Sequence, residues 1–274
     1  MALSKSLADA YQDAEYALLE PPLAFRIGEP SAPLDALLAR FGAASGVFLT
    51  AVNPRSERKS AEENRAALAE LEKTLAAANY SRCPAEGRDP RRRWPSEPGF
   101  FVPGLPRGDA AALGRRFRQN AIVYAERGSA PRLVDLTGPV RIVLDTNVWL
   151  DWLVFDDPSL APLRSALAAG RVEIVIDESC AAELAEVLKR PFRRAFDPSL
   201  AMRECLRLSV FSRESFSGKN LPSCRDPDDQ KFLEAAAAAQ AEVLLTKDEA
   251  LLELARRKPP FRIADPKKFA FDQM

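Results

Sequence analysis

The chain has 274 residues with 39 basic and 39 acidic side chains, so its formal net charge is zero, and it contains no histidine. This length favours two domains, and the neutral balance excludes a global positive field, so any nucleic-acid binding has to come from local basic patches. The sequence shows no signal-peptide pattern at its start, no apolar run long enough to span a membrane and no C-x-x-C pair among its four cysteines, which predicts a cytoplasmic protein with reduced thiols.

The first half of the sequence predicts an α+β domain. Residues 46–52 have the pattern of a strand, and Ser60 with Glu63 forms an S-x-x-E capping box that opens a helix over 61–78. The other predicted elements are strands at 100–102 and 122–124 and a helix over 109–118.

Several polar side chains of this half could line a pocket, and they are Asn53, Asn64, Glu97 and Gln119. Turn, cap and surface roles explain the same residues more simply. The basic segment beside Trp94, with Arg88 and residues 91–93, is interpreted as a solvated loop, with nucleic-acid contact as the alternative. We therefore assign no enzymatic activity to this half.

The boundary between the halves is predicted at Gly138-Pro139, directly before the apolar run 140–144. The predicted domains are residues 1–137 and 138–274. In the second domain, strands are expected at 141–148, 172–177, 242–246 and 261–264, and helices at 159–169, 179–188, 200–210, 227–240 and 249–257. Short runs of Val, Ile and Leu separated by helices indicate a parallel sheet covered on both faces, in which ligands bind beyond the carboxyl ends of the strands.

Four groups of acidic residues follow apolar runs in this half, and they are Asp145, then Glu183, then Asp226 with Asp228 and Asp229, and then Asp248. Carboxylates that converge repel one another unless a divalent cation compensates their charge. Oxygen ligands without histidine favour Mg²⁺ or Mn²⁺ over zinc. Taken one by one, the same acids have simpler interpretations as helix caps or as the exit of a strand.

Glu183 can be compared with a neighbour on its own helix. The apolar residues of this helix place Glu183 roughly 85° and Glu186 roughly 145° from the centre of the buried face, at 100° per residue. Glu183 is therefore predicted to border the core and Glu186 to face water.

The order of the four acidic groups favours one interpretation. The segments D-T-N-V, A-A-E-L-A-E-V-L, D-P-D-D-Q-K-F-L-E-A-A and L-L-T-K-D-E-A-L-L together resemble the PIN-domain ribonuclease family, and in particular its branch of toxins in toxin-antitoxin systems. The resemblance extends from about residue 140 to the C-terminus. It implies an α/β fold with a PIN-like parallel sheet sandwiched by helices, preceded by a smaller α+β domain.

The resemblance implies four catalytic and metal-binding acids, which are Asp145, Glu183, Asp229 and Asp248, with Asp226 as the competitor of Asp229. Thr146, Asn147 and Thr246 would support these acids by hydrogen bonds. Lys247 stands where this branch often has glycine, and its ammonium would reach either a phosphate or solvent. The implied reaction is hydrolysis of an RNA phosphodiester by water, with one or two Mg²⁺ or Mn²⁺ ions.

RNA is the implied substrate, and an antitoxin protein and a second copy of the chain are implied partners. The candidate contacts to the RNA backbone are Lys189, Arg190, Arg193 and Arg194, around Phe192. A solvated helix end is the simpler interpretation of that segment. The alternative function is a non-catalytic PIN-like module that binds RNA or a partner. A haloacid-dehalogenase-like phosphatase is disfavoured because its second Asp is replaced by Asn147.

The first half has a resemblance of its own. The segments T-A-V-N-P-R-S, S-A-E-E-N, W-P-S-E-P-G-F and F-R-Q-N-A-I resemble an uncharacterised bacterial family of domains of unknown function, over about residues 11–124. Val52 stands where an aromatic residue is common in that family. The resemblance implies no particular chemistry.

Overall fold

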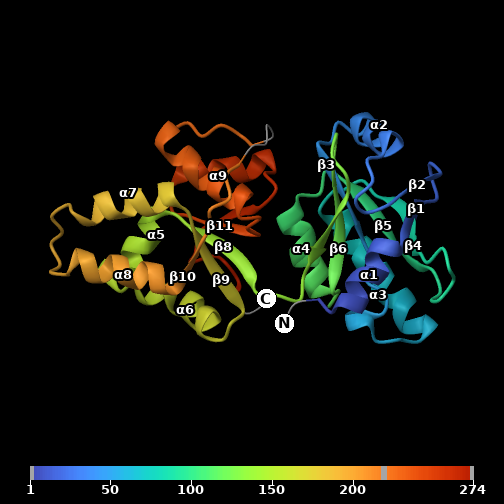
Figure 1. Ribbon diagram of the computed structural model, residues 1–274, viewed down its shortest axis with the longest axis horizontal. Coiled ribbons are helices and arrows are strands. Elements are labelled where there is room, and N and C mark those ends of the chain that lie inside the picture. Colours follow the sequence, from blue (N-terminus) through green and yellow to red (C-terminus); the bar gives the residue numbers. More distant parts are fainter. Residues whose placement is uncertain (1–2, 217–220, 272–274) are drawn as a thin grey trace. The chain divides into compact units, whose positions relative to one another are not determined.

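The computed structural model describes residues 3–216 and 221–271 (Figure 1). The chain divides into two compact units between Gly138 and Pro139. The units are nearly equal in length, so the first is not the smaller one. Within the described ranges, no helix has both the length and the apolar character needed to cross a membrane.

The first unit is built on one antiparallel sheet with the strand order β2-β1-β4-β5-β3-β6-β7. Its strands are β1 (Glu15–Leu18), β2 (Leu23–Phe25), β3 (Ser45–Leu49), β4 (Cys83–Arg88), β5 (Glu97–Pro103), β6 (Ala121–Glu126) and β7 (Arg132–Asp135). Its helices are α1 (Lys5–Asp13), α2 (Ala32–Arg40), α3 (Ala61–Ala77) and α4 (Arg107–Arg116).

Both faces of this sheet are buried. Along β3, Val47 and Leu49 belong to a core that includes Leu71 and Leu75 of α3, whereas Phe48 belongs to a second core that includes Leu38 of α2. Alternate residues of one strand therefore enter different cores, as the period of two in a strand requires. This double burial explains why the run Val47–Leu49 of β3 is apolar without alternation.

The α+β class predicted for this half is confirmed. The predicted helices 61–78 and 109–118 correspond to α3 and α4. The predicted strand 46–52 ends earlier, at Leu49, because the chain turns away and Asn53 adopts the left-handed conformation with φ of 50°. The sequence patterns missed α1, α2, β1, β2, β4 and β7.

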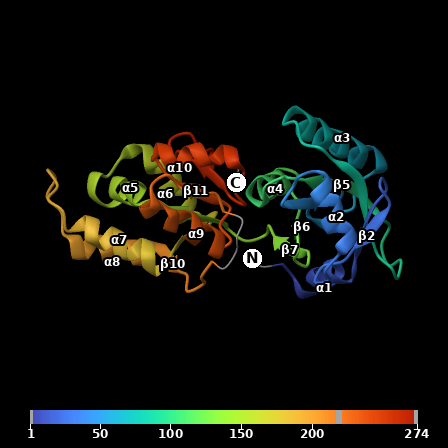
Figure 2. The same ribbon diagram turned by 90° about the horizontal axis from the view of Figure 1, so that it is seen from above.

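The second unit contains a sheet of five parallel strands with the order β10-β9-β8-β11-β12. The strands are β8 (Val140–Leu144), β9 (Val172–Ile176), β10 (Ser209–Phe211), β11 (Val243–Leu245) and β12 (Arg262–Ala264). The helices are α5 (Thr146–Leu150), α6 (Ala161–Ala168), α7 (Glu178–Leu188), α8 (Pro198–Leu208), α9 (Gln230–Ala238) and α10 (Glu249–Glu253). The strands lie among these helices in both views (Figures 1 and 2). The predicted α/β class is confirmed.

Two predicted boundaries in this unit are wrong. The strand expected over 141–148 ends at Leu144, because Asp145 caps α5 and Thr146 is already helical. The helix expected over 200–210 ends at Leu208, and residues 209–211 form β10 on the edge of the sheet. In addition, the helix expected over 227–240 begins with a 3-10 turn at Pro227–Asp229.

The strand order creates a switch point beside the central strand. From β8 the chain continues to β9 and β10 on one side, and it then returns to β11 and β12 on the other side. In open parallel sheets of this kind, a crevice forms beyond the carboxyl ends of the two strands where the order reverses. Here these strands are β8 and β11, and the residues that follow them are Asp145 and Thr246.

Candidate active site

Asp145 occupies the carboxyl end of the central strand β8. Only 3% of the surface of Asp145 is exposed to solvent. One carboxylate oxygen, Oδ2, accepts a hydrogen bond of 2.6 Å from the Thr246 hydroxyl, and the other accepts a bond of 3.4 Å from the backbone N–H of Asn147. The Thr246 hydroxyl in turn accepts a bond of 2.9 Å from the backbone N–H of Asp248. These bonds join the ends of β8 and β11 and orient the Asp145 carboxylate.

Glu183 lies on α7 and is held from two sides. The Thr146 hydroxyl donates a hydrogen bond of 2.7 Å to its Oε1 atom, and the Lys231 ammonium forms an ion pair with its Oε2 atom. The Glu183 side chain is 24% exposed, whereas that of Glu186 is 70% exposed. The two acids therefore differ in exposure in the direction that the helical periodicity predicts.

Asp229 ends the 3-10 turn that precedes α9. No described residue donates a hydrogen bond to its carboxylate. Burial, followed by the negative charges of Asp145, Asp248, Asp226 and Glu183, raises its pKa to about 6. Acids from three other segments, together with Asp226 of the same turn, therefore lie near enough to Asp229 to destabilise its charged form.

Asp145 has a raised pKa for related reasons. Burial is the largest cause, and the charges of Glu183 and Asp248 act in the same direction. The hydrogen bonds from Thr246 and Asn147 oppose the shift because they stabilise the ionised form. A positive charge placed beside this carboxylate would remove the repulsion.

Three of the predicted acids line one open cleft of about 770 Å³, and these are Asp145, Glu183 and Asp229. Asp248 and Asp226 do not line it. Asp248 caps α10 by accepting hydrogen bonds of 2.7 and 3.2 Å from the backbone N–H groups of Ala250 and Leu251. Asp226 is exposed and caps the 3-10 turn before α9. Both act on the cleft through their charge.

Two family models match the chain. Residues 141–250 match the model described as PIN domain. The second unit carries a PIN domain. Residues 49–122 match the model described as Protein of unknown function (DUF3293), and no curated protein shows a significant match to the chain. The resemblance of the second half to the PIN-domain family and that of the first half to a family of unknown function are thereby confirmed. The PIN match places the second unit in a nuclease-like family, and the toxin branch stays a prediction.

The basic segment after α7 has one side chain at the cleft of the PIN domain. Arg190 lines it, together with Phe192. Lys189 instead pairs with Glu186 at 2.5 Å, and Arg194 donates a hydrogen bond of 2.5 Å to the backbone carbonyl of Phe155. Arg193 is exposed and does not line the cleft.

The other predicted supporting residues also have definite places. Thr146 and Thr246 each hold one acid, as described above. Asn147 lines the cleft, but its contact with Asp145 is made by its backbone N–H. The Lys247 ammonium lies 2.5 Å from a carboxylate oxygen of Asp151, so it pairs with an acid of the chain itself.

Sequence reasoning missed several residues that line the cleft, of which Lys231 is the charged one. Asp228, named only as a member of the third acidic group, and Glu186, predicted to face water, also line the cleft. A signal for Lys231 was present, because a lysine in the first turn of a helix opposes the helix dipole and needs a compensating partner. Its partner is Glu183, which lies 48 residues earlier in the sequence. Such a contact cannot be read from local periodicity.

The donor set of the cleft is suited to a hard divalent ion, because its acids supply only oxygen ligands. Within residues 3–216 and 221–271, however, no three His, Cys, Asp or Glu side chains are already grouped closely enough to share one ion. The hydrogen bonds of Asp145 to Thr246, and of Glu183 to Thr146 and Lys231, account for the present directions of these two carboxylates. The residues therefore fit a metal by their chemistry and by their shared cleft.

Proposed function

We propose that the PIN domain is a metal-dependent endoribonuclease that hydrolyses RNA phosphodiesters. The observation that carries this proposal is that Asp145, Glu183 and Asp229 line one cleft. Burial, followed by repulsion from the surrounding acids, raises the pKa of Asp229 there. A cleft with surplus negative charge disfavours RNA unless a cation is bound with it. The family match to a PIN domain supports the same assignment.

In this proposal Asp145, Glu183 and Asp229 hold Mg²⁺ or Mn²⁺, and Asp248 and Asp226 contribute negative charge from outside the cleft. When bound, the ion would lower the pKa of a water molecule and offset charge that develops on the phosphate. Thr246 orients Asp145, and Thr146 orients Glu183. Residues of this kind determine how well a ligand side chain is placed.

Two cations of the cleft are suited to the RNA backbone. Lys231 and Arg190 line the same cleft as the acids. The Lys231 ammonium contacts Glu183, and it carries more donors than that single contact uses. We propose that it also donates to a phosphate oxygen, and that Arg190 contacts a neighbouring phosphate.

The test is cleavage of single-stranded RNA by the purified chain with Mg²⁺ or Mn²⁺, with and without EDTA. We expect cleavage that EDTA abolishes and that Asp145→Asn reduces more than about 100-fold. The control is Glu249→Gln, which removes a charge from an exposed residue beside Asp248 without altering the cleft. Equal activity of Asp145→Asn and the wild type would show that the cleavage does not take place at this cleft.

The second candidate is a PIN-like module that binds RNA or a partner without cleaving RNA. One observation favours it, which is that Lys231 neutralises Glu183 from within the chain. This candidate predicts that the wild type binds single-stranded RNA in Mn²⁺ and cuts none of several RNAs. It also predicts that the Asp145→Asn variant binds Mn²⁺ as tightly as the wild type does.

The biological role that we propose is that of a toxin in a toxin-antitoxin pair, active on cytoplasmic RNA as a homodimer. Its support is the resemblance of the four acidic segments to that branch of the family. Induced synthesis of the chain should arrest bacterial growth, and synthesis of Asp145→Asn should not. Light scattering of the purified chain tests the dimer.

A further inference from the structure

The first unit holds a cavity that the proposed nuclease does not use. Its volume is about 380 Å³, which lies within the range of roughly 300–1,000 Å³ for small-molecule sites. Aromatic rings form much of the wall, from Tyr11 of α1, Tyr16 of β1, Phe48 of β3 and Trp94 before β5. Flat apolar walls of this kind favour a planar ligand.

The carboxylate of Glu97 lines the cavity together with these aromatic rings. Its Oε1 atom accepts a hydrogen bond of 2.7 Å from the side-chain amide of Asn53, and no described residue donates to Oε2. Burial raises the pKa of Glu97, and the Asn53 bond opposes that shift. Burial and the charge of Glu97 raise the pKa of Tyr11 to about 12, which keeps the Tyr11 hydroxyl protonated. The cavity therefore presents an acceptor with unused capacity.

The Asn53 amide is held in one orientation. Its oxygen accepts bonds from the backbone N–H of Lys59 at 3.1 Å and from the Asn64 side chain at 3.0 Å. The Asn53 backbone N–H donates to Asn64 Oδ1 at 3.0 Å. Because the amide oxygen is occupied, the amide nitrogen faces Glu97 and keeps its carboxylate in place.

The loop that carries Asn53 is strained. Asn53, Arg55 and Ser56 have φ angles of 50°, 60° and 59°, in the left-handed region that residues other than glycine rarely adopt. Asn53 and Ser56 both line the cavity, and the Asn120 side chain donates a bond of 2.9 Å to the Ser56 hydroxyl. Strain that is retained beside a cavity indicates a functional position.

The mouth of the cavity is basic. Arg58, Arg93, Trp94 and Pro95 line both the cavity and an adjoining hollow, which Arg92 also lines. The two hollows therefore lie on either side of the same side chains. A ligand that fills the cavity would extend past these arginines.

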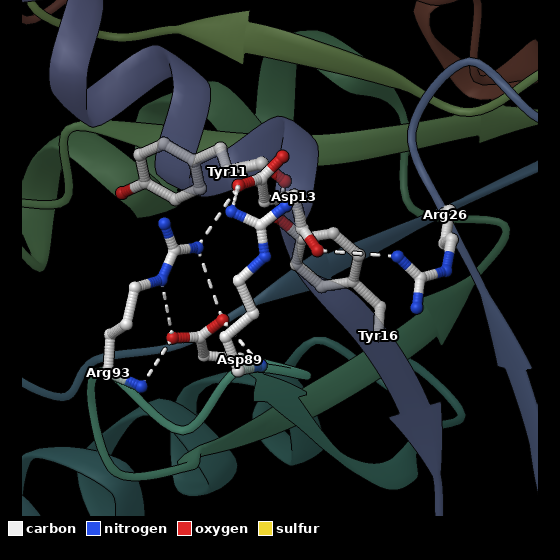
Figure 3. A network of polar contacts seen from close by, with 7 residues as sticks. Tyr11, Asp13, Tyr16, Arg26, Asp89 and Arg93 are labelled. Carbon is white, nitrogen blue, oxygen red and sulfur yellow. Dashed lines mark hydrogen bonds and ion pairs between the residues drawn. The ribbon is translucent and has the colours of Figure 1, made fainter.

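At this mouth, Arg93 already forms ion pairs with two acids of the chain. Figure 3 shows its guanidinium between Asp89 and Asp13, with contacts of 2.9 and 3.1 Å. In contrast, Arg58 and Arg92 are exposed and form no ion pair with any described residue. The mouth therefore offers two uncompensated positive charges, which suit an anionic group.

We propose that this cavity binds a guanine nucleotide, with the base between the aromatic walls, its N1–H and 2-amino groups on Glu97, and its phosphate on Arg58 and Arg92. A carboxylate can accept hydrogen bonds from two parallel N–H groups. Guanine presents two such groups, N1–H and the 2-amino group, side by side on one edge. Adenine has an acceptor at N1 and would place a lone pair against the carboxylate. The site is thus built to select guanine over adenine.

The guanine nucleotide can come from two sources, a free nucleotide or a guanosine within single-stranded RNA. Both present the same base edge and a phosphate. The experiment uses the full chain in EDTA, so that metal-dependent binding at the PIN cleft does not contribute. Failure of the proposed nuclease would leave this result unchanged.

Calorimetric titration with GMP, AMP and guanosine tests the proposal. We expect GMP to bind with a Kd below about 1 mM, AMP to bind at least about tenfold more weakly, and guanosine to bind more weakly than GMP. Equal affinities for GMP and AMP in the wild type, or no GMP binding at all, would overturn the proposal without any variant.

Substitutions locate the site. Glu97→Gln should abolish the preference for GMP over AMP, whereas Glu62→Gln, at an exposed position on α3, should keep it. Arg58→Ala should remove the advantage of GMP over guanosine, whereas Arg65→Ala on the same helix as Glu62 should not. Unchanged selectivity in a folded Glu97→Gln chain contradicts the assignment.

Competition distinguishes the two sources. A short RNA with one guanosine, or the same RNA with adenosine in its place, is added to the complex with GMP. Displacement by the guanosine RNA below the GMP concentration supports recognition within RNA. Displacement only at higher concentration supports a free nucleotide. Displacement by both RNAs equally would overturn recognition of the base.

Discussion

The acidic cleft of the PIN domain and the aromatic cavity of the first unit both contain carboxylates with raised pKa values. In the cleft, Asp229 is surrounded by other acids, and their charges add to the effect of burial. In the cavity, Glu97 has amide and aromatic neighbours, and burial alone raises its pKa. The same functional group is thus suited to a cation in one place and to neutral N–H donors in the other, because its neighbours differ.

The two sites also arise from different sheet architectures. In the second unit, a parallel sheet with a reversal of strand order collects Asp145 and Thr246 at adjacent strand ends. In the first unit, the cavity is lined by residues of α1 and of the antiparallel strands β1, β3, β4, β5 and β6. The cleft follows from strand order, whereas the cavity depends on how a helix and a loop cover a sheet.

The strongest test of the comparison is a pair of variants with opposite effects. Asp145→Asn should reduce RNA cleavage more than about 100-fold and leave GMP affinity unchanged. Glu97→Gln should abolish the preference for GMP over AMP. It should leave the cleavage rate on an RNA without guanosine unchanged. Loss of both properties in either variant would show that the two sites act as one.

Thr246→Val should show how far the cleft depends on its hydroxyls. Valine keeps the buried shape of threonine and removes the bond to Asp145. We expect a loss of about 10–100-fold in Mn²⁺ affinity or cleavage rate, as for other residues that orient a metal ligand. Mn²⁺ titration followed by paramagnetic resonance measures this effect, and wild-type affinity would argue against Asp145 as a ligand.

Lys231→Met tests whether the Lys231 ammonium competes with a metal ion for the acids of the cleft. Without its ammonium, the acids of the cleft lose a competing cation, and we expect Mn²⁺ to bind roughly fivefold more tightly, for an interaction of about 1 kcal/mol at a surface. RNA affinity should fall. The control is Lys268→Met, because Lys268 is exposed and does not line the cleft. Weaker Mn²⁺ binding in Lys231→Met would contradict this role.

The smallest predicted effect concerns acid stability of the first unit. Hydrogen bonding to Arg93 lowers the pKa of Asp89 from 3.8 to about 2. Asp89 therefore stabilises the folded state above pH 3.8, and this contribution is lost as the pH falls through about 2. Calorimetric melting between pH 7 and pH 2 should show a steeper decline of Tm for the wild type than for Asp89→Asn. Parallel declines would exclude Asp89 as a source of this dependence.

Much of the PIN domain was predictable because its signals are local. Runs such as residues 140–144 are apolar without alternation, which is typical of a buried parallel strand, and α7 places Glu183 and Glu186 by simple helical geometry. The order of four short acidic segments indicated the family. The strand and helix signals depend on residues that are neighbours in the sequence, and the family signal depends on the order of such short segments along the chain.

The first unit was harder to predict for a physical reason. Strand β1 has the short sequence E-Y-A-L, and in β4, C-P-A-E-G-R, the residues that alternate to the buried face are the small Cys83, Ala85 and Gly87. These signals are weak, and both strands form by pairing with each other and with β2 and β5. The cavity joins Tyr11, Phe48 and Glu97, which come from three distant segments of the chain. Asn53 and Glu97 were noticed as polar residues, but only their hydrogen bond shows that they act together.

The sequence by itself therefore determined the fold class of each half, the PIN family of the second half and the identity of the acids near its site, because local apolar runs, helix periodicity and caps encode them. Only the tertiary structure decided which acids share the cleft, since this depends on the strand order that brings β8 beside β11. It also decided that Lys231 pairs with Glu183 and that Glu97 enters an aromatic cavity. Such contacts join distant segments, and their energies arise only when the chain is packed.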